Sequence, residues 1–189
     1  MSNLLELPPD LPVPQDDGAA DHLAGFPAPQ VSLPSTAGES VALDDLGPGR
    51  TVLFVYPMTG RPGATLPEGW DAIPGARGCT SEACDFADQH AELIDAGASA
   101  VFGISARDID YQHEAADRLR LPYALLSDAD LQLAKHPGLP TFEAGGLTLF
   151  KRLTLVVRDG VIEHVFYPVF PPNEHAAQVL AWLRAHPAV

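Results

Sequence analysis

The sequence TVLFVY at residues 51–56 is a continuous run of apolar and β-branched residues without a charge. Such a run is typical of an inner strand of a sheet that is covered on both faces. Two further apolar stretches, at residues 98–105 and 122–126, predict strands of the same sheet. The segments between them, 80–96 and 108–119, carry apolar residues at helical spacing. Because helices of this length connect parallel neighbours, the chain predicts a sheet built from strand–helix–strand units.

The end of the chain adds antiparallel strands to this sheet. Residues 153–157 and 161–167 alternate around Asp159-Gly160, a pair that strongly favours a tight hairpin turn. A last helix is expected over residues 173–185. The predicted fold class is therefore α/β, with a central mixed β-sheet flanked by helices.

Two segments show no clear period. Residues 1–25 carry five acidic side chains, no Lys or Arg and several prolines, so we expect an acidic arm that is mobile or draped over the rest. Residues 26–189 form the folded domain, which is long enough to bury a sizeable core. Within it, residues 58–78 are rich in Gly and Pro. Loops of about 20 residues in compact domains are usually functional or disordered.

Charge and composition exclude several classes of protein. The formal net charge of the 189-residue chain is -14, which argues against nucleic acid or an anionic membrane surface as a partner. No apolar run approaches the roughly 18 residues that a membrane-spanning helix needs, and residues 1–10 do not resemble a signal peptide. We therefore expect a cytoplasmic protein. In that reducing compartment two cysteines are too few for a disulfide scaffold, and a close pair is more often redox-active or metal-binding.

The two cysteines of the chain lie together in the sequence GCTSEACDF at residues 78–86. Cys79 is expected at the N-cap or in the first turn of the helix that follows. Unpaired backbone N–H groups and the helix dipole stabilise an anion there, and they lower the pKa of a thiol from about 8.5 toward neutrality or below. Arg77 lies two residues away, and Gly78 lets the backbone approach closely, which makes Gly78 a candidate substrate-binding position. Cys79 is therefore the candidate nucleophile.

Cys84 lies five residues after Cys79. In an intact α-helix this separation is about 7.5 Å of rise, with a rotation of about 140° off the same face. A disulfide needs Cα atoms within about 7 Å of each other and Cβ vectors that face each other. The two thiols can therefore bond only if the first turn or two of the helix unwinds. Two alternatives stay open: either cysteine is an ordinary small buried residue, or the pair binds a metal, for which the spacing and the seven histidines offer poor support.

The motif CTxEACxF at residues 79–86, behind a strand that ends in Tyr56-Pro57, resembles the peroxiredoxins, and most of all their peroxiredoxin Q or bacterioferritin-comigratory branch. The resemblance in element order covers roughly residues 26–186. It implies a thioredoxin-like fold and a thiol-dependent peroxidase, with no metal, flavin or other cofactor. Members of that branch are often monomers, so we expect a monomer.

The resemblance also assigns roles to the two cysteines. Cys79 aligns with the peroxidatic cysteine, which a peroxide oxidises to a sulfenic acid. Cys84 aligns with the resolving cysteine of the same chain, which condenses with that acid to a disulfide. The implied substrates are hydrogen peroxide or organic hydroperoxides, and a thioredoxin-type dithiol would reduce the disulfide by exchange.

Arg152 matches the second anchor of the family, an Arg that leads a late strand. The resemblance implies that Arg152 holds the thiolate and the peroxide oxygens, and stabilises charge as the O–O bond breaks. From the residues alone, Arg152 would be a solvated cation at a strand end. Glu82 is a good acid for a first helical turn, and whether it shapes the site or only stabilises the helix stays open.

The sequence departs from the family pattern before Cys79. In the family, a Pro precedes a Thr by four residues, and that Thr precedes the cysteine by three. Here Pro57 lies 22 residues before Cys79, and Ala76, which has no hydroxyl, stands in the place of the Thr. We expect Pro57 and a Thr that folds back from the insertion to bind the peroxide, with Thr59 the first candidate and Thr65 the second. If neither does, we expect slower catalysis or a different substrate.

Two other functions remain in view. A disulfide oxidoreductase of the thioredoxin type suits the fold, although such enzymes use Cys-x-x-Cys and this pair is more widely spaced. A non-catalytic redox sensor or binding module is suggested by the missing Thr and by the long insertion at residues 58–78. Trp70 in that insertion either lines an apolar substrate pocket or packs the loop down.

Overall fold

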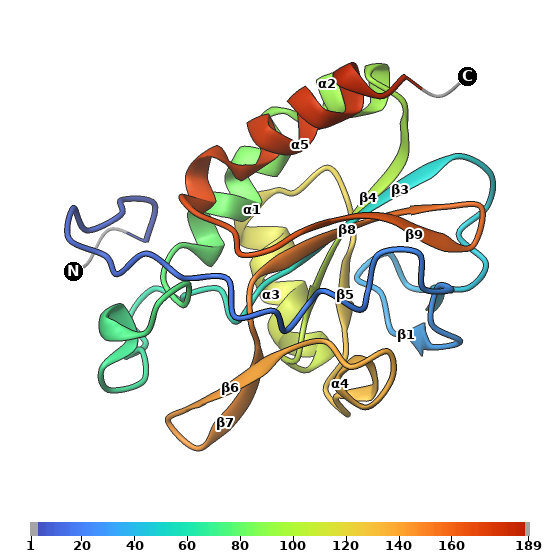
Figure 1. Ribbon diagram of the computed structural model, residues 1–189. Coiled ribbons are helices and arrows are strands. Elements are labelled where there is room, and N and C mark those ends of the chain that lie inside the picture. The colour runs from blue at the N-terminus through green and yellow to red at the C-terminus, as the bar shows by residue number, and fades with distance from the viewer. Residues whose placement is uncertain (1–3, 188–189) are drawn as a thin grey trace.

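A five-stranded mixed sheet forms the centre of the protein, whose computed structural model describes residues 4–187 (Figure 1). Its strands lie in the order β5 (Leu125–Ser127), β4 (Ala98–Ser105), β3 (Arg50–Val55), β8 (Leu153–Arg158) and β9 (Val161–Phe166). β3 pairs in parallel with β4 and antiparallel with β8, so the predicted mixed sheet is confirmed. Every residue of β3 is buried, as expected for an inner strand.

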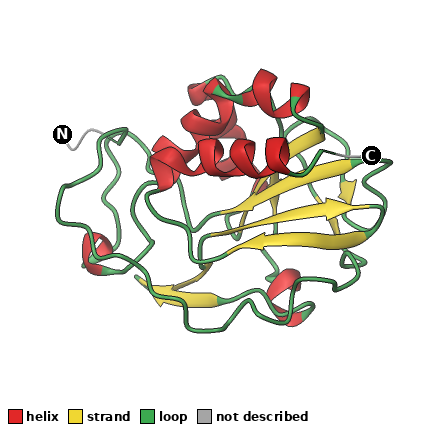
Figure 2. Ribbon diagram, turned by 45° about the horizontal axis from the view of Figure 1, so that its top comes forward, coloured by secondary structure: helices red, strands yellow, loops and turns green. Residues whose placement is uncertain are grey.

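Helices pack on one face of this sheet (Figure 2). Phe54 of β3 stacks on Phe86 of the first helix, with the ring centroids 4.3 Å apart, and Leu183 of the last helix belongs to the same core. These contacts hold the first helix against β3. The helices are α1 (Cys79–Asp88), α2 (His90–Asp95), α3 (Ile109–Leu119) and α5 (His175–Ala185).

Short elements and loops cover the other face of the sheet. Leu53 and Val55 of β3 point into a second core there, together with Leu133. Side chains alternate between the two faces along a strand, which is why Phe54 and its neighbours in β3 belong to different cores. The short elements are β1 (Ser32–Leu33), β2 (Val41–Ala42) and α4 (Gln132–Lys135).

Three elements differ from the sequence-based expectation. The helix expected over residues 80–96 is divided at Gln89 into α1 and α2. The strand expected over 122–126 begins only at Leu125. The hairpin of β6 (Thr141–Ala144) and β7 (Leu147–Phe150) was not expected at all, although the Gly145-Gly146 pair at its turn was an available signal.

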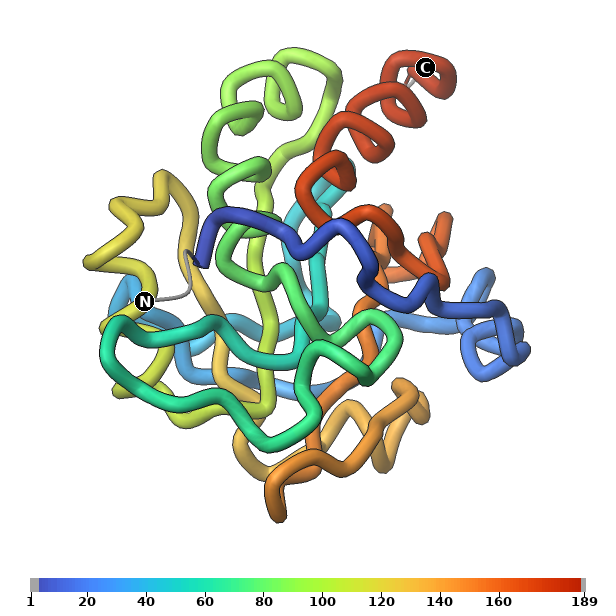
Figure 3. Tube along the Cα trace, turned by 90° about the vertical axis from the view of Figure 1, so that its left-hand side faces the viewer, coloured from blue at the N-terminus to red at the C-terminus, as the bar shows by residue number. Residues whose placement is uncertain are grey.

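The N-terminal arm, residues 4–25, lies against the folded domain (Figure 3). Leu23 is fully buried, and the amide of Gly25 donates to the carbonyl of Ile162 at 2.8 Å. Asp17 pairs with Lys151 at 2.6 Å. In Figure 3 the blue arm crosses in front of the green loop that leads into α1. The arm therefore reaches from the core of the domain to the edge of the sheet where α1 begins.

The insertion, residues 58–78, is irregular apart from the 3₁₀ turn η1 (Trp70–Ala72). Trp70 is only 4% exposed and lies 6.1 Å from Phe142, so it packs the loop onto the β6–β7 hairpin. A second 3₁₀ turn, η2 (Pro172–Glu174), leads into α5. Among the described residues, no helix is long and apolar enough to cross a membrane.

Candidate active site

Cys79 is the first residue of α1 and is 2% exposed. Gly78, the N-cap, has a φ of 107°, in the left-handed region that favours glycine. A Cβ on Gly78 would lie 2.3 Å from Cγ of Pro172 in η2, so a larger residue would push the start of α1 away from this turn. The predicted position of Cys79 at the helix start is confirmed, and Gly78 is what allows it.

The sulfur of Cys79 lies among two donors and one acceptor. The Met58 amide donates to Sγ at 3.3 Å and Nη2 of Arg152 donates at 3.2 Å, while the thiol donates to the carbonyl of Ala76 at 3.5 Å. Burial raises the pKa of the Cys79 thiol, whereas Arg152 and the Met58 amide act against this rise. The helix start alone therefore does not create the thiolate; the two donors are the groups that stabilise it.

Arg77 does not contact the sulfur of Cys79, although its position two residues before Cys79 suggested that it would. Its guanidinium pairs with Asp71 at 3.2 Å. The cation that contacts the sulfur is instead Arg152, which lies 73 residues further along the chain. The side chain of Arg77 is paired with Asp71 inside the insertion, whereas Arg152, directly before β8, reaches the sulfur.

Arg152 is 3% exposed and immediately precedes β8, so it is not a solvated cation. Its guanidinium donates to three backbone carbonyls at the end of the insertion, each at 3.3 Å, and it also forms an ion pair with Glu82. Arg152 thereby holds the last turn before α1 and the sulfur together. The three carbonyls belong to Gly75, Ala76 and Arg77.

Glu82 is completely buried in the first turn of α1, so it shapes the site and is not a surface carboxylate. One carboxylate oxygen accepts from Arg152, and the other, Oε1, has no hydrogen-bond partner in the described part of the chain. Burial raises the pKa of Glu82 to about 7, although Arg152 opposes the rise. Near neutral pH the carboxyl is thus divided between its neutral and its ionised form.

The insertion returns to Cys79 through its first residues. Thr59 is fully buried, and its hydroxyl has no hydrogen-bond partner among residues 4–187. The carbonyl of Thr59 accepts from the hydroxyl of Tyr111 at 2.5 Å, and the next amide, that of Gly60, donates to the hydroxyl of Thr80 at 3.2 Å. Thr65 is exposed. Of the two candidate threonines, the structure brings Thr59 close to the start of α1.

Pro57 and Ala76 are both buried beside this segment. The carbonyl of Pro57 accepts from the hydroxyl of Ser105 at the end of β4, at 2.9 Å. Ala76 offers no side-chain polar group, but its carbonyl accepts from both Cys79 and Arg152. The position that holds a hydroxyl in the family pattern therefore takes part here through its backbone.

Cys84 is half-buried, and both cysteines are free thiols. The turns of α1 between them are intact, and two contacts from outside hold them. The hydroxyl of Tyr123 donates to the carbonyl of Ala83 at 2.6 Å, and the amide of Ala176 in α5 donates to the carboxylate of Asp85 at 2.9 Å. A bond between the two sulfurs thus requires that α1 open against these contacts.

Sequence reasoning missed Tyr111 and Tyr123. Both lie outside any motif, and their hydroxyls meet backbone carbonyls that a sequence does not bring together. The ring of Tyr111 makes cation–π contacts with two guanidinium groups, whose Cζ atoms lie 3.9 Å (Arg61) and 4.5 Å (Arg107) from the ring centroid. The one available signal for Tyr111 was the helical spacing of apolar residues over 108–119, which places it on the buried face of α3.

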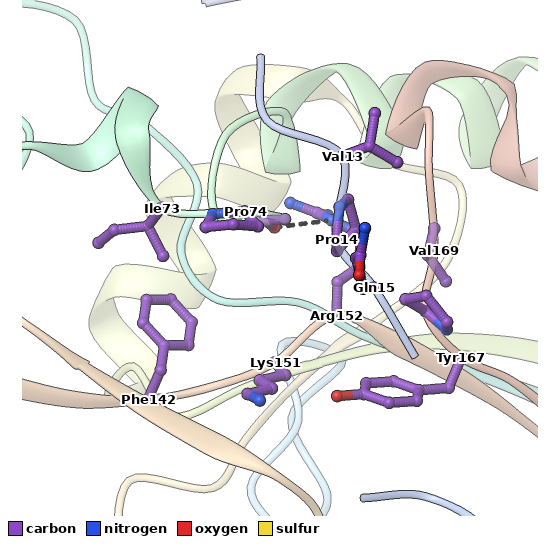
Figure 4. Close-up of a pocket in the computed structure, with 12 residues that line it drawn as sticks. Val13, Pro14, Gln15, Ile73, Pro74, Phe142, Lys151, Arg152, Tyr167 and Val169 are labelled. Atoms are coloured by element: carbon purple, nitrogen blue, oxygen red, sulfur yellow. Dashed lines mark hydrogen bonds between the residues drawn. The ribbon is translucent and has the colours of Figure 1, made fainter. Parts of the chain in front are cut away.

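A cavity of about 320 Å³ lies next to Arg152 (Figure 4). Pro14 of the N-terminal arm, Ile73 of the insertion, and Phe142 and Tyr167 line it, so most of its wall is apolar. Among the described residues, no group of three or more His, Cys, Asp or Glu side chains is placed to hold a metal ion.

Comparisons with known proteins agree with this geometry. The Redoxin family matches residues 23–180. Peroxiredoxin Bcp of Escherichia coli is 33% identical over 167 residues, which cover 86% of this chain and 96% of that protein. Chloroplastic peroxiredoxin Q of Arabidopsis thaliana is 32% identical over 162 residues, covering 85% of this chain and 67% of the relative.

Solved structures share the fold. Peroxidoxin BcpB from Mycobacterium tuberculosis superposes with a TM-score of 0.69 at 31% identity, covering 88% of this chain and all of that one. Peroxiredoxin Q of Xanthomonas campestris superposes with a TM-score of 0.64 at 21% identity, covering 94% of this chain and 98% of that one, a likeness of fold. The expected thioredoxin-like fold is confirmed.

Proposed function

The chain belongs to the redoxin family and, within it, to the peroxiredoxins, and on that premise we propose that it is a thiol-dependent peroxidase whose nucleophile is Cys79. The observation that carries this proposal is the setting of the sulfur. It is buried at a helix start, and both the Arg152 guanidinium and the Met58 amide donate to it.

The first step is the attack of the Cys79 thiolate on a peroxide oxygen. The O–O bond breaks, the sulfur becomes a sulfenic acid, and water or an alcohol leaves after taking up one proton. Negative charge builds up on the leaving oxygen during this step. Because Arg152 is buried and held by three carbonyls, it is positioned to stabilise that charge without reorganisation.

Pro57, Thr59 and Gly78 are the proposed substrate-binding positions. Thr59 has the strongest support, because its buried hydroxyl has no hydrogen-bond partner within residues 4–187, which is costly, and a peroxide oxygen could supply that partner. Gly78 supports the role by keeping the backbone close to Cys79, and Pro57 by leading directly into the Met58 amide.

In the second step the thiol of Cys84 attacks the sulfenic sulfur, which forms the Cys79–Cys84 disulfide and releases water. Since α1 is intact in the reduced protein, we propose that this step requires its first turns to open. A thioredoxin-type dithiol then reduces the disulfide by exchange and is itself oxidised. We propose that the enzyme acts as a monomer in the cytoplasm, where such reductants are present.

One titration tests the proposed function. Reduced protein treated with one equivalent of hydrogen peroxide should lose two thiols and form an intramolecular disulfide, which mass spectrometry detects. Cys84→Ser should lose one thiol and stop at the sulfenic acid, and Cys79→Ser should lose none rapidly. Full peroxidase activity in Cys79→Ser would refute the proposal. Reduction of insulin without peroxide turnover would identify a disulfide oxidoreductase instead.

A further inference from the structure

Two cavities of very different size meet next to Cys79. The space directly over Cys79 is about 10 Å³, enough for about one water-sized molecule. The neighbouring hollow, formed mainly by the insertion, is about 1010 Å³. Four side chains line both cavities and so form the partition between them: Leu4, Leu66, Trp70 and Arg77.

Three members of this partition belong to the insertion and are held by it and by the β6–β7 hairpin. Trp70 is 4% exposed and packs against Phe142, and Arg77 is held by Asp71 and is buried. Leu66 packs in the same apolar cluster as Trp70. These side chains form the wall on the insertion's side of the opening.

The fourth member, Leu4, comes from the N-terminal arm. A Cβ on Gly60 would lie 2.5 Å from Cδ2 of Leu4, so this side chain lies directly on the backbone of Gly60. Leu7 lies in the same way against Gly78, because a Cβ on Gly78 would be 3.0 Å from Cδ2 of Leu7. The arm thus passes over both ends of the segment that carries the site, Gly60 and Gly78.

We propose that Leu4 is a specificity-determining residue, which closes the space over Cys79 to a size that admits hydrogen peroxide and excludes bulky organic hydroperoxides. The inference rests on the proposed peroxidase function and adds to it a side chain that selects the substrate. Hydrogen peroxide has two heavy atoms and is the smallest peroxide, so it needs the least widening of this water-sized space. An alkyl or aryl group needs the larger hollow, whose lining includes Leu66, Pro67 and Trp70 and suits an apolar substituent.

The two cavities would merge if the side chain of Leu4 were shortened. Leu4→Ala removes the part of the partition that belongs to the arm and leaves the insertion's wall in place. The donors to the sulfur are the Met58 amide and Arg152, and shortening the aliphatic side chain of Leu4 removes neither of them, so the chemistry toward a small peroxide should persist. The expected effect is therefore a change in preference between peroxides and not a general change in rate.

The experiment compares the rate constants for oxidation of Cys79 by hydrogen peroxide and by cumene hydroperoxide, measured by stopped flow on reduced full-length protein. In Leu4→Ala the rate constant with cumene hydroperoxide should rise by about tenfold or more, because steric exclusion from a pocket is worth at least that much, while the rate constant with hydrogen peroxide stays nearly the same. Leu5→Ala is the matched control, since Leu5 is 53% exposed and lines neither cavity. It should leave both rate constants at the wild-type level.

Three results would overturn the inference: equal changes with both peroxides, no change with either, or the same shift in preference in Leu5→Ala. Leu4→Phe provides a second check, because a larger side chain should keep cumene hydroperoxide excluded. If the wild-type protein reacts with neither peroxide faster than a free thiol does, the proposed function itself is refuted. If the wild type is active but Leu4→Ala does not change its preference between the peroxides, only the inference about Leu4 is refuted.

Discussion

At the scale of single residues, the environment of Cys79 is built from three parts of the chain. The Met58 amide lies three residues after β3, Arg152 lies directly before β8, and Gly78 is the N-cap of α1. Burial favours the neutral thiol, and the two donors favour the thiolate. The reactivity of the sulfur is therefore set by the balance between these effects, and each donor can be tested separately.

Arg152→Lys should lower the rate constant for peroxide oxidation of Cys79 by about a hundredfold or more. A lysine keeps the charge but cannot reproduce the planar fork that reaches the sulfur and three carbonyls. The pKa of the Cys79 thiol should rise, because a contact that lowers it is lost. Stopped-flow oxidation measured over a range of pH gives both quantities. Arg158→Lys, at the other end of β8, is the control, and an equal loss in both variants would contradict this role.

Thr59→Val should lower the same rate constant by about tenfold or more, since it removes the proposed hydrogen bond to the reacting peroxide while the shape of the side chain is kept. Thr65→Val is the matched control, because Thr65 is exposed on the same insertion. A Thr59→Val protein with wild-type kinetics would show that the insertion does not supply the hydroxyl absent at Ala76.

Glu82 makes the stability of the protein depend on pH. Its pKa is raised from the usual 4.5 to about 7, so between these values the folded protein holds a proton that the unfolded chain releases. The free energy of unfolding contributed by Glu82 is therefore fully present below about pH 4.5 and is lost as pH rises through about 7. Urea titrations at several pH values should show this decline in the wild type and a flatter profile in Glu82→Gln. Glu68→Gln, at an exposed site, should keep the wild-type slope.

At the scale of elements, the proposed reaction needs α1 in two states, intact for the first step and open for the second. Intact, it presents Cys79 at its first turn and separates the two sulfurs. Opened, it lets them bond. Phe86 anchors the helix in the core by stacking on Phe54, and the contacts from Tyr123 and Ala176 hold the turns near Cys84. The strength of those contacts should control how often the helix opens.

Tyr123→Phe should speed the formation of the Cys79–Cys84 disulfide by about two- to tenfold. The substitution removes the hydrogen bond to the carbonyl of Ala83 but keeps the ring, and a bond of this kind is worth about 0.5–1.5 kcal/mol. Rapid-quench mass spectrometry separates the sulfenic acid from the disulfide and gives the rate of the second step alone. Tyr167→Phe, which removes a hydroxyl bonded to Asp17, is the control. An unchanged second step would mean that this contact does not limit opening.

At the scale of the whole molecule, the N-terminal arm contacts both the core on the α4 side of the sheet and the start of α1. Leu23 belongs to the core beneath the sheet, and Asp17 pairs with Lys151 next to Arg152. Leu4 and Leu7 then pass over the start of α1. The sequence presents the same segment as an acidic, proline-containing arm, and only its contacts show what it is attached to.

Leu23→Ala should lower the free energy of unfolding by about 2–5 kcal/mol, the usual cost of a cavity at a fully buried leucine. Val13→Ala, on the same arm but 60% exposed, should change it by no more than about 0.5 kcal/mol. Denaturant unfolding measures both. If Leu23→Ala had the stability of the wild type, residues 1–25 would be an appendage, separate from the domain that begins at residue 26.

The sequence by itself determined the central strand, the order of the main-sheet strands and of the helices between them, and the position of Cys79 at a helix start, because these follow from local periodicity and from neighbours a few residues apart. The spacing from Cys79 to Cys84 likewise determined that a disulfide needs the helix to open. The family resemblance pointed to Arg152 and ranked Thr59 before Thr65. The tertiary structure then showed that Arg152 contacts the sulfur while Arg77 pairs with Asp71, that Thr59 is buried near the start of α1 whereas Thr65 is exposed, and that Leu4 lies over the site. These contacts join residues far apart in the chain. Local sequence patterns do not predict which distant side chain will meet a site, nor where a long irregular loop will pack.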